Sequence, residues 1–174
     1  NSIVNLGGSA IYIVADVSIE LDCSKMISKV VNHYGRIDIL INNAGISMRA
    51  LFLNLDLRDF KKVMNINFYG TVYVTKYALK YILATKGSIV GVSSIAGHKG
   101  LPARTAYSAS KFAMTGFLEA LRIENLKNGL HVLIASPGFT ASSIRQNALN
   151  SSGGSQKESP RNENKMMTAE EVAK

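Results

Sequence analysis

Tyr107 and Lys111 are the pair of side chains in this sequence best suited to exchange a proton near neutral pH. Four positions separate them within a stretch of helical periodicity, so both lie on one helix face, one turn from each other. A neighbouring ammonium favours the phenolate and is expected to lower the tyrosine pKa from its usual value of about 10. A tyrosine of lowered pKa can serve as a general acid or base. Taken alone, the pair is better explained as a surface contact, so its surroundings must decide.

Four short apolar runs alternate with stretches of helical periodicity. The runs are typical of strands buried in a parallel sheet and cover residues 11–15, 37–41, 87–92 and 130–135. Helices are expected over residues 18–34, 56–84 and 106–127, the second as a short helix leading into a long one. This alternation predicts one α/β domain over residues 1–174, a doubly wound parallel sheet of Rossmann type with helices on both faces.

Polar residues and glycines follow each predicted strand, at the edge where ligands bind to sheets of this type. They are Asp16, Asn42 to Gly45, Ser93 to Gly97 and Ser136 to Thr140. Ser94 stands 13 residues before Tyr107, and Ser93 beside it is expected to be structural. An Asn-Asn-Ala-Gly segment alone is more often a turn. Here it follows a predicted strand, and polar residues and glycines follow the next strands as well. This arrangement favours a binding function.

In this order the markers resemble those of the short-chain dehydrogenase/reductase family. The resemblance covers roughly residues 10–145 and rests on Asp16-Val17, Asn42-Asn43-Ala44-Gly45, Asn67-Phe68-Tyr69-Gly70, Ser94, Tyr107-Ser108-Ala109-Ser110-Lys111 and Pro137-Gly138. One such motif is weak evidence, whereas the ordered set is highly specific.

The resemblance implies a role for each marker. Tyr107 would be the catalytic acid or base, Ser94 would hold the substrate oxygen, and Lys111 would bind the nicotinamide ribose while lowering the tyrosine pKa. Asn67 would interrupt its helix locally and help anchor a water that relays protons through Lys111. The cofactor, NAD or NADP, would contact Tyr107 and Lys111, and also Asp16, Val17, Asn43, Ala44, Gly45, Pro137, Gly138 and Thr140. Asp16 and Val17 would lie at the adenine, residues 43–45 on the adenosine side, and residues 137, 138 and 140 around the nicotinamide carboxamide.

The family's glycine-rich phosphate loop, T-G-x-x-x-G-x-G, is absent from the sequence. Gly7 and Gly8 precede a predicted strand and cannot open a helix toward a pyrophosphate. In the doubly wound order the run at 11–15 would be the third strand and the run at 37–41 the fourth, so the sheet would be split between them. We therefore expect a fragment, incomplete at both termini, that lacks the first two strands and a last one. The same gap hides the residues that distinguish NAD from NADP.

Composition limits the remaining classes. The net charge of +8 comes from scattered basic residues, which favours a solvated surface over nucleic-acid binding. Cys23 is the only cysteine, and His33, His98 and His131 lack metal-ligand spacing, so no metal site is expected. No uncharged apolar run is long enough to span a membrane. A cytoplasmic protein fits these features best.

Two further patterns concern partners and the C-terminal part. Tyr69, Tyr73, Tyr77 and Tyr81 recur every four residues along one helix, and they either pack on the domain's own core or form a subunit interface. Because relatives commonly pair through this helix, we favour a homodimer or homotetramer. Residues 150–165 are polar and aperiodic and predict a mobile loop within a substrate lid over 139–168. Thr168 and Glu171 form a capping-box pattern for a final helix.

The expected function is an oxidoreductase that interconverts a small alcohol and a carbonyl by hydride transfer. The alternative is a non-catalytic cofactor sensor or scaffold on the same fold, which the missing glycine loop would favour in a complete chain. Retention of Asn67, Ser94, Tyr107 and Lys111 together speaks against it. An epimerase or dehydratase could share the Tyr-Lys pair, but Asn67 suits simple reduction better.

Overall fold

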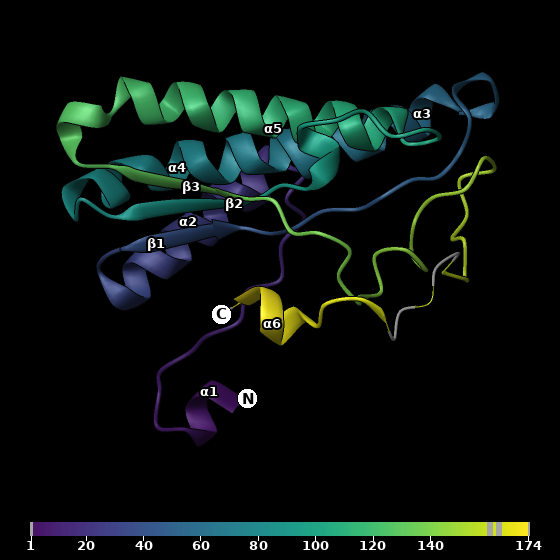
Figure 1. Cartoon of the computed structure of the whole chain (residues 1–174). Coiled ribbons are helices and arrows are strands. Elements are labelled where there is room, and N and C mark those ends of the chain that lie inside the picture. Colours follow the sequence, from purple (N-terminus) through teal and green to yellow (C-terminus); the bar gives the residue numbers. More distant parts are fainter. Residues whose placement is uncertain (1, 160–161, 163–164, 174) are drawn as a thin grey trace.

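Three parallel strands form one continuous sheet in the computed structural model, which describes residues 2–159, 162 and 165–173. The strands are β1 (Ile39–Asn42), β2 (Ser88–Val92) and β3 (His131–Ala135), in the order β1-β2-β3 (Figure 1). Leu40 pairs with Ile89, and Ile89 pairs with Val132, so these side chains share one face of the sheet. The three strands overlap the predicted runs at 37–41, 87–92 and 130–135.

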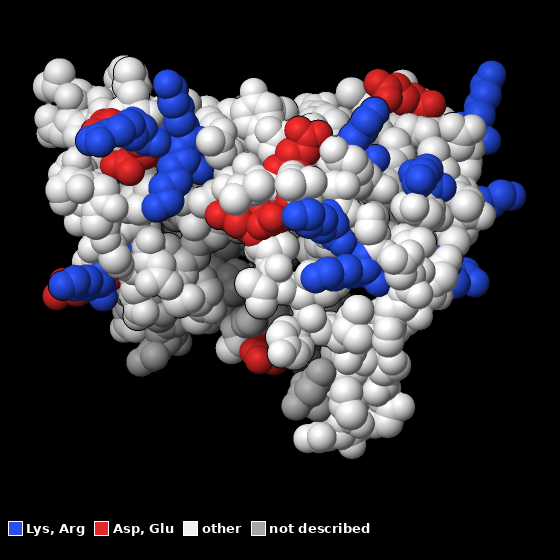
Figure 2. All heavy atoms as spheres, turned by 180° about the vertical axis from the view of Figure 1, so that it is seen from behind, with Lys and Arg blue, Asp and Glu red and all other residues white. Residues whose placement is uncertain are grey.

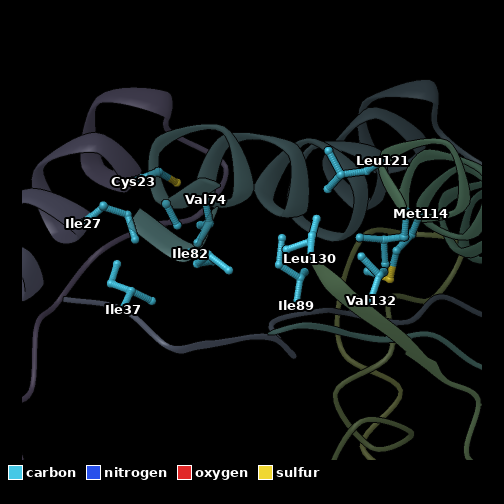
Figure 3. Close-up of a cluster of buried hydrophobic side chains, with 12 residues drawn as sticks. Cys23, Ile27, Ile37, Val74, Ile82, Ile89, Met114, Leu121, Leu130 and Val132 are labelled. Atoms are coloured by element: carbon cyan, nitrogen blue, oxygen red, sulfur yellow. The ribbon is translucent and has the colours of Figure 1, made fainter. Parts of the chain in front are cut away.

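Three long helices form the layer on this face. They are α2 (Glu20–Tyr34), α4 (Gly70–Ala84) and α5 (Thr105–Glu124). Helices α4 and α5 are packed on the strands, and α2 is packed on α4. Ile89 and Val132 from the sheet join Ile82 of α4 and Met114 of α5 in the main hydrophobic core, with Cys23 of α2 at its other end (Figure 3). Burial of such side chains supplies most of the stabilisation of this layer. The α/β class with a parallel sheet is confirmed.

The opposite face of the sheet is open to solvent. Its side chains belong to the alternate positions of the strands, where Ile41 pairs with Val90 and Val90 pairs with Leu133. Ile41 is 61% exposed and Leu133 50% exposed, and Ile39 next to them is exposed as well. Apolar residues on both faces of a strand are typical of a sheet that is covered on both sides. The long helices that the structure describes cover only one of them.

The predicted helix over residues 56–84 is divided into three parts. They are α3 (Leu57–Met64), a π-helical turn η2 (Asn65–Tyr69) and α4. The side chain of Asp56 caps α3 by accepting a hydrogen bond from the backbone N–H of Arg58 at 2.8 Å. A π-turn inside a helix is frequent at functional sites. The expected interruption at Asn67 is confirmed.

The predicted strand at residues 11–15 is wrong. This segment is extended, but it forms no strand among the described residues, and Tyr12 and Val14 are about nine-tenths exposed. A strand requires a neighbour to pair with its backbone N–H and C=O groups. The segment leads instead into α2, which ends at Gly35 in the left-handed conformation (φ 76°), as expected.

The remaining helices are short. They comprise α1 (Ser2–Asn5), α6 (Ala169–Ala173) and the 3-10 helices η1 (Phe52–Asn54), η3 (Ile95–Gly97) and η4 (Leu126–Asn128). The capping box of α6 is confirmed: the Thr168 N–H donates to Glu171 Oε2 at 2.7 Å and the Glu171 N–H donates to Thr168 Oγ1 at 3.1 Å. None of the described helices has the length and apolar character needed to span a membrane.

The C-terminal segment after β3 is irregular but anchored. Leu149 bridges Met48 on one side and Ser155 on the other, and the Gln156 side chain donates to the Arg49 carbonyl at 2.9 Å. The predicted lid therefore contacts the segment that follows β1. Part of the predicted mobile loop, residues 160–161 and 163–164, lies outside the described residues.

Candidate active site

Tyr107 lies in the first turn of α5, and its ring is half-buried against a second hydrophobic cluster. The cluster comprises Met48, Ala50, Leu55, Val63, Ala106 and Leu149. It joins the segment after β1, the helix α3 and the C-terminal segment around the phenol ring. These apolar contacts fix the ring and withdraw it from water.

Ser94 lies beside the Tyr107 phenol, and the interaction of its side chain with the hydroxyl acts to lower the tyrosine pKa. Ser94 follows β2 and caps η3, where its Oγ accepts from the Ala96 N–H at 3.2 Å. Its neighbour Ser93 is buried, with its Oγ 3.3 Å from Thr115 Oγ1. The structure thus brings Ser94 and Tyr107 together and gives Ser93 a packing role, as expected.

The prediction that the pKa of Tyr107 is lowered is wrong for this arrangement. Burial raises the pKa above its usual value, and the hydrogen bond with Ser94 and the positive charge of Arg104 lower it only in part. The Lys111 ammonium, expected to lower it, is 5.9 Å from the ring centroid and donates to the Val92 carbonyl at 2.7 Å.

Lys111 is itself buried, with 4% of its surface exposed. Burial lowers its pKa to about 8, because the charged form loses hydration. Its ammonium still holds a proton at pH 7, next to the carboxyl end of β2. A buried amine of this kind can stabilise a nearby negative charge more strongly than one in water.

Asn67 connects the π-turn to the two neighbouring segments. Its side chain accepts from the Ile46 N–H at 2.8 Å and donates to the Ile46 carbonyl at 2.9 Å and to Ser110 Oγ at 2.9 Å. Ser110 in turn donates to the Tyr107 carbonyl at 2.8 Å. The chain of bonds fixes the turn of α5 that carries Tyr107 and Lys111. Asn67 is fully buried, and these contacts place it beside the turn that carries Tyr107 and Lys111. Its predicted role in anchoring a water stays a prediction.

The predicted adenosine-side residues divide into two groups. Val17, Asn43 and Ala44 line a groove of about 370 Å³ between α2, β1 and α4. Gly70 lets Val17 approach α4, because a Cβ on this glycine would lie 2.9 Å from Val17 Cγ2. Gly45 lies elsewhere, beside Asn67 and Lys111.

Asp16 is exposed and engaged in a local turn at the start of α2. Its Oδ1 accepts from the Ser18 N–H at 2.9 Å and from the Ser18 hydroxyl at 2.7 Å, and these bonds lower the pKa of Asp16. It does not line the groove with Val17. Asp16 therefore stabilises the local turn before α2. Its predicted contact with the adenine stays a prediction.

Pro137, Gly138 and Thr140 follow β3, at the same sheet edge as Ser94. A Cβ on Gly138 would meet nothing within 4 Å, so its surroundings are open. Thr140 bridges Met167 and its carbonyl accepts from Arg145 at 2.6 Å. His98 Nε2 lies 2.8 Å from Ser136 Oγ, which links the segments after β2 and β3.

The residues at this edge fit the nicotinamide-ribose part of a dinucleotide. A Cβ on Gly45 would lie 3.2 Å from Asn67 Oδ1 and 3.7 Å from Lys111 Nζ. Because glycine has no side chain, space is left between its backbone and these polar atoms. Lys111, Tyr107 and Ser94 offer donors suited to hydroxyl and carbonyl oxygens. Within the described residues, no group of three or more His, Cys, Asp and Glu side chains could hold a metal ion.

Three polar residues of the site were missed by reasoning from sequence. Ser110 stands between Tyr107 and Lys111, and its spacing of three from Tyr107 could have revealed its hydrogen bond. Arg104 stands three residues before Tyr107 and donates to the hydroxyl of buried Ser47. The partner Ser47 is 57 residues away in sequence, so no local pattern could have indicated the contact.

Sequence comparison identifies the family. The model of the family described as "short chain dehydrogenase" matches residues 1–152. The chain belongs to the short-chain dehydrogenase family. A protein named 11-beta-hydroxysteroid dehydrogenase A from Arachis hypogaea is 38% identical over 152 residues, which are 86% of this chain and 43% of that protein. 11-beta-hydroxysteroid dehydrogenase 1A from Arabidopsis thaliana is 38% identical over 139 residues, 79% of this chain and 40% of that protein.

Solved structures of short-chain dehydrogenases share the fold. An alcohol dehydrogenase from the archaeon Thermococcus sibiricus, complexed with 5-hydroxy-NADP, matches 98% of this chain and 68% of its own with a TM-score of 0.85 and 21% identity. An NAD+-bound xylitol dehydrogenase matches 79% of this chain and 54% of its own with a TM-score of 0.76 and 31% identity. This chain spans less than half the length of the curated relatives named above.

Proposed function

We propose that the complete protein is a nicotinamide-dependent oxidoreductase that interconverts an alcohol and a carbonyl, with Tyr107 as the general acid or base. The observation that carries the proposal is the contact of Ser94 with the Tyr107 phenol, one helical turn from the buried ammonium of Lys111. Family membership supports an oxidoreductase. The relatives' names, hydroxysteroid dehydrogenases, support an alcohol or ketone as substrate without identifying it.

The roles of the side chains follow from their donors and acceptors. In reduction, Tyr107 donates its hydroxyl proton to the substrate oxygen, and Ser94 donates a hydrogen bond to the same atom. In oxidation, the Tyr107 phenolate accepts the proton of the alcohol. A bound NAD or NADP would supply or take up the hydride. Lys111 is positioned to bind the ribose hydroxyls, while Asn67 and Ser110 hold the turn in place.

The cofactor residues form part of the same proposal. Val17, Asn43 and Ala44 would contact the adenosine side of the cofactor, with Asp16 at the adenine end. Gly45, Pro137, Gly138 and Thr140 would lie closer to the nicotinamide and its ribose, since Gly45 lies beside Lys111 and the other three follow β3. The structures complexed with 5-hydroxy-NADP and NAD+ support both cofactors equally.

Self-association is a separate part of the proposal. Tyr73, Tyr77 and Tyr81 pack partly on the domain's own core, whereas Tyr69 is 44% exposed and stacks on Tyr73 at a centroid distance of 6.0 Å. We infer a homodimer or homotetramer in which the exposed end of this row is buried. Sedimentation of the complete protein as a monomer at micromolar concentration would refute this inference.

The complete protein, assayed against a panel of alcohols and ketones while nicotinamide absorbance is followed, tests the proposed activity. We expect turnover with at least one member and with either NAD(H) or NADP(H). Cofactor binding by calorimetry without turnover on any alcohol or ketone would favour a non-catalytic sensor or scaffold instead.

A further inference from the structure

His98 and Ser136 join the segments that follow two neighbouring strands of the sheet, β2 and β3 (Figure 1). His98 Nε2 lies 2.8 Å from Ser136 Oγ, and either atom can be the donor. His98 follows η3, whereas Ser136 directly follows β3. Next to this pair, the Ser93 N–H donates to the Ala135 carbonyl at 2.7 Å. The two segments therefore leave the sheet side by side, and the histidine extends their contact beyond the strand ends.

The turn that carries His98 is fixed relative to Ser94. The Gly97 N–H donates to the Ser94 carbonyl at 2.8 Å. The His98 N–H donates to the Ile95 carbonyl at 3.0 Å. On its inner side η3 packs on α5, where a Cβ on Gly97 would lie 3.1 Å from the Lys111 carbonyl oxygen. The backbone of His98 is thus held to Ser94 and to the helix of the tyrosine-lysine pair.

The segment after β3 has open surroundings at Gly138. This glycine is exposed, and a Cβ on it would meet nothing within 4 Å. Further along, the Ala141 N–H donates to the Met167 carbonyl at 2.8 Å and anchors the far end of the open stretch. The contact with His98 anchors its near end at Ser136. A short stretch that is held at both ends has fewer conformations available than one held at a single end.

We propose that His98 is a positioning residue of the active site, whose contact with Ser136 fixes the segment after β3 relative to Ser94. The inference rests on the proposed function, in which Ser94 binds the substrate oxygen and residues 137, 138 and 140 lie around the nicotinamide. Hydride transfer requires the nicotinamide and the substrate carbon at a fixed distance, and a misplacement of about 1 Å can cost about a hundredfold in rate. His98 acts on this distance through Ser136.

Steady-state kinetics of the complete protein provides the first test. In His98→Ala we expect kcat to fall about three- to tenfold, while the KM of the substrate stays within about twofold of wild type. The primary isotope effect, measured with cofactor deuterated at the transferred position, should rise because hydride transfer becomes the slower step. Ser136→Ala should behave in the same way, and the double variant should lose no more than either single variant. His98→Gln, whose amide nitrogen can replace Nε2, should recover most of the lost rate.

Amide hydrogen exchange provides a second test that needs no turnover. In His98→Ala the Ala141 N–H should exchange about three- to tenfold faster at unchanged global stability, because the segment after β3 opens more often. NMR of the complete protein labelled with nitrogen-15 measures this rate. His131→Ala is the matched control, since it removes an exposed histidine side chain from the opposite end of β3. It should change neither kcat nor the exchange of Ala141.

The possible failures are distinguishable. In an active protein, an unchanged kcat in His98→Ala, additive losses in the double variant or an equal loss in His131→Ala overturns the inference. A fall in kcat with an unchanged isotope effect, which a loss of folded protein would give, overturns it as well. Unchanged exchange of the Ala141 N–H in His98→Ala overturns it whether or not the protein is active. Faster exchange in His98→Ala of a protein without turnover refutes the proposed function and supports the contact as the anchor of the segment.

Discussion

The Tyr107 corner and the β1 edge of the sheet differ in how completely this chain builds them. At the corner, three segments distant in sequence surround the phenol, and Asn67, Ser110 and Lys111 all have hydrogen-bond partners. At the edge, Ile39 and Ile41 are exposed, and the groove beside β1 is lined largely by apolar side chains. The residues that we propose for proton transfer, Asn67, Ser94, Tyr107 and Lys111, therefore lie with their supporting contacts within residues 42–149. The surface assigned to the adenosine side of the cofactor is only partly enclosed by them.

Charged side chains of both signs share one face of the molecule. Lys and Arg side chains are interspersed with acidic ones over the face seen in Figure 2. The net charge of +8 is therefore carried as a mixed surface on that face, in line with the expected solvated exterior.

Substitution of Asn67 should have the largest effect on stability. In Asn67→Ala the N–H and carbonyl of Ile46 and the hydroxyl of Ser110 each lose a partner, and a cavity is left. We expect a loss of about 3 to 4 kcal/mol in the free energy of unfolding, measured by urea denaturation of the complete protein. Asn65→Ala, an exposed neighbour in the same π-turn, should change it by less than about 0.5 kcal/mol. Equal effects of the two would show that the Tyr107 corner does not depend on this network.

Alanine substitutions on the two faces of the sheet should differ in their effect on stability. Ile89 is fully buried under the helices, whereas Ile41 on the neighbouring strand faces the open side. Ile89→Ala should cost about 3 kcal/mol of unfolding free energy and Ile41→Ala less than about 1 kcal/mol. Thermal and urea denaturation of the complete protein measure both. A cost for Ile41→Ala as large as that for Ile89→Ala would mean that the open face is covered in the complete protein.

The pH dependence of stability reports on Lys111. Burial lowers its pKa to about 8 in the folded protein, below the unfolded value of 10.5, so the unfolded chain holds more protons between these values. Stability should therefore rise with pH from about 8 to 10, by about 2 kcal/mol relative to Lys111→Met, which lacks the titrating group. Cys23 and Tyr107, whose pKa values burial raises, work in the opposite direction but are present in both proteins. Parallel stability curves of the two proteins would contradict a buried, charged Lys111.

Sequence patterns predicted the elements whose signals are local. The three strands, the helix stop at Gly35, the π-turn around Asn67 and the capping box of α6 all follow from nearby residues or from the family's markers. The run at 11–15 failed because an apolar run becomes a strand only when another strand pairs with it. Since the first two strands were expected to be missing, the run at 11–15 had no neighbour to pair with.

The site was predicted by residue but only in part by geometry. Ser94, Tyr107, Lys111 and Asn67 do meet at one place, as the order of the markers implies. The predicted lowering of the Tyr107 pKa by Lys111 was wrong, because the Lys111 ammonium points to the Val92 carbonyl, which comes from a segment distant in sequence. Arg104 was missed for the same reason, since its anchor Ser47 comes from a distant segment.

The catalytic rate of Tyr107→Phe in the complete protein tests whether this phenol transfers the proton. Phenylalanine keeps the ring that packs against Met48 and Leu149 but removes the proton that the hydroxyl carries. We predict a loss of about a thousandfold in kcat, with cofactor affinity within about twofold of wild type, while the matched variant Tyr69→Phe stays fully active. A Tyr107→Phe variant that retains more than about a tenth of the wild-type kcat would contradict the claim that this phenol transfers the proton.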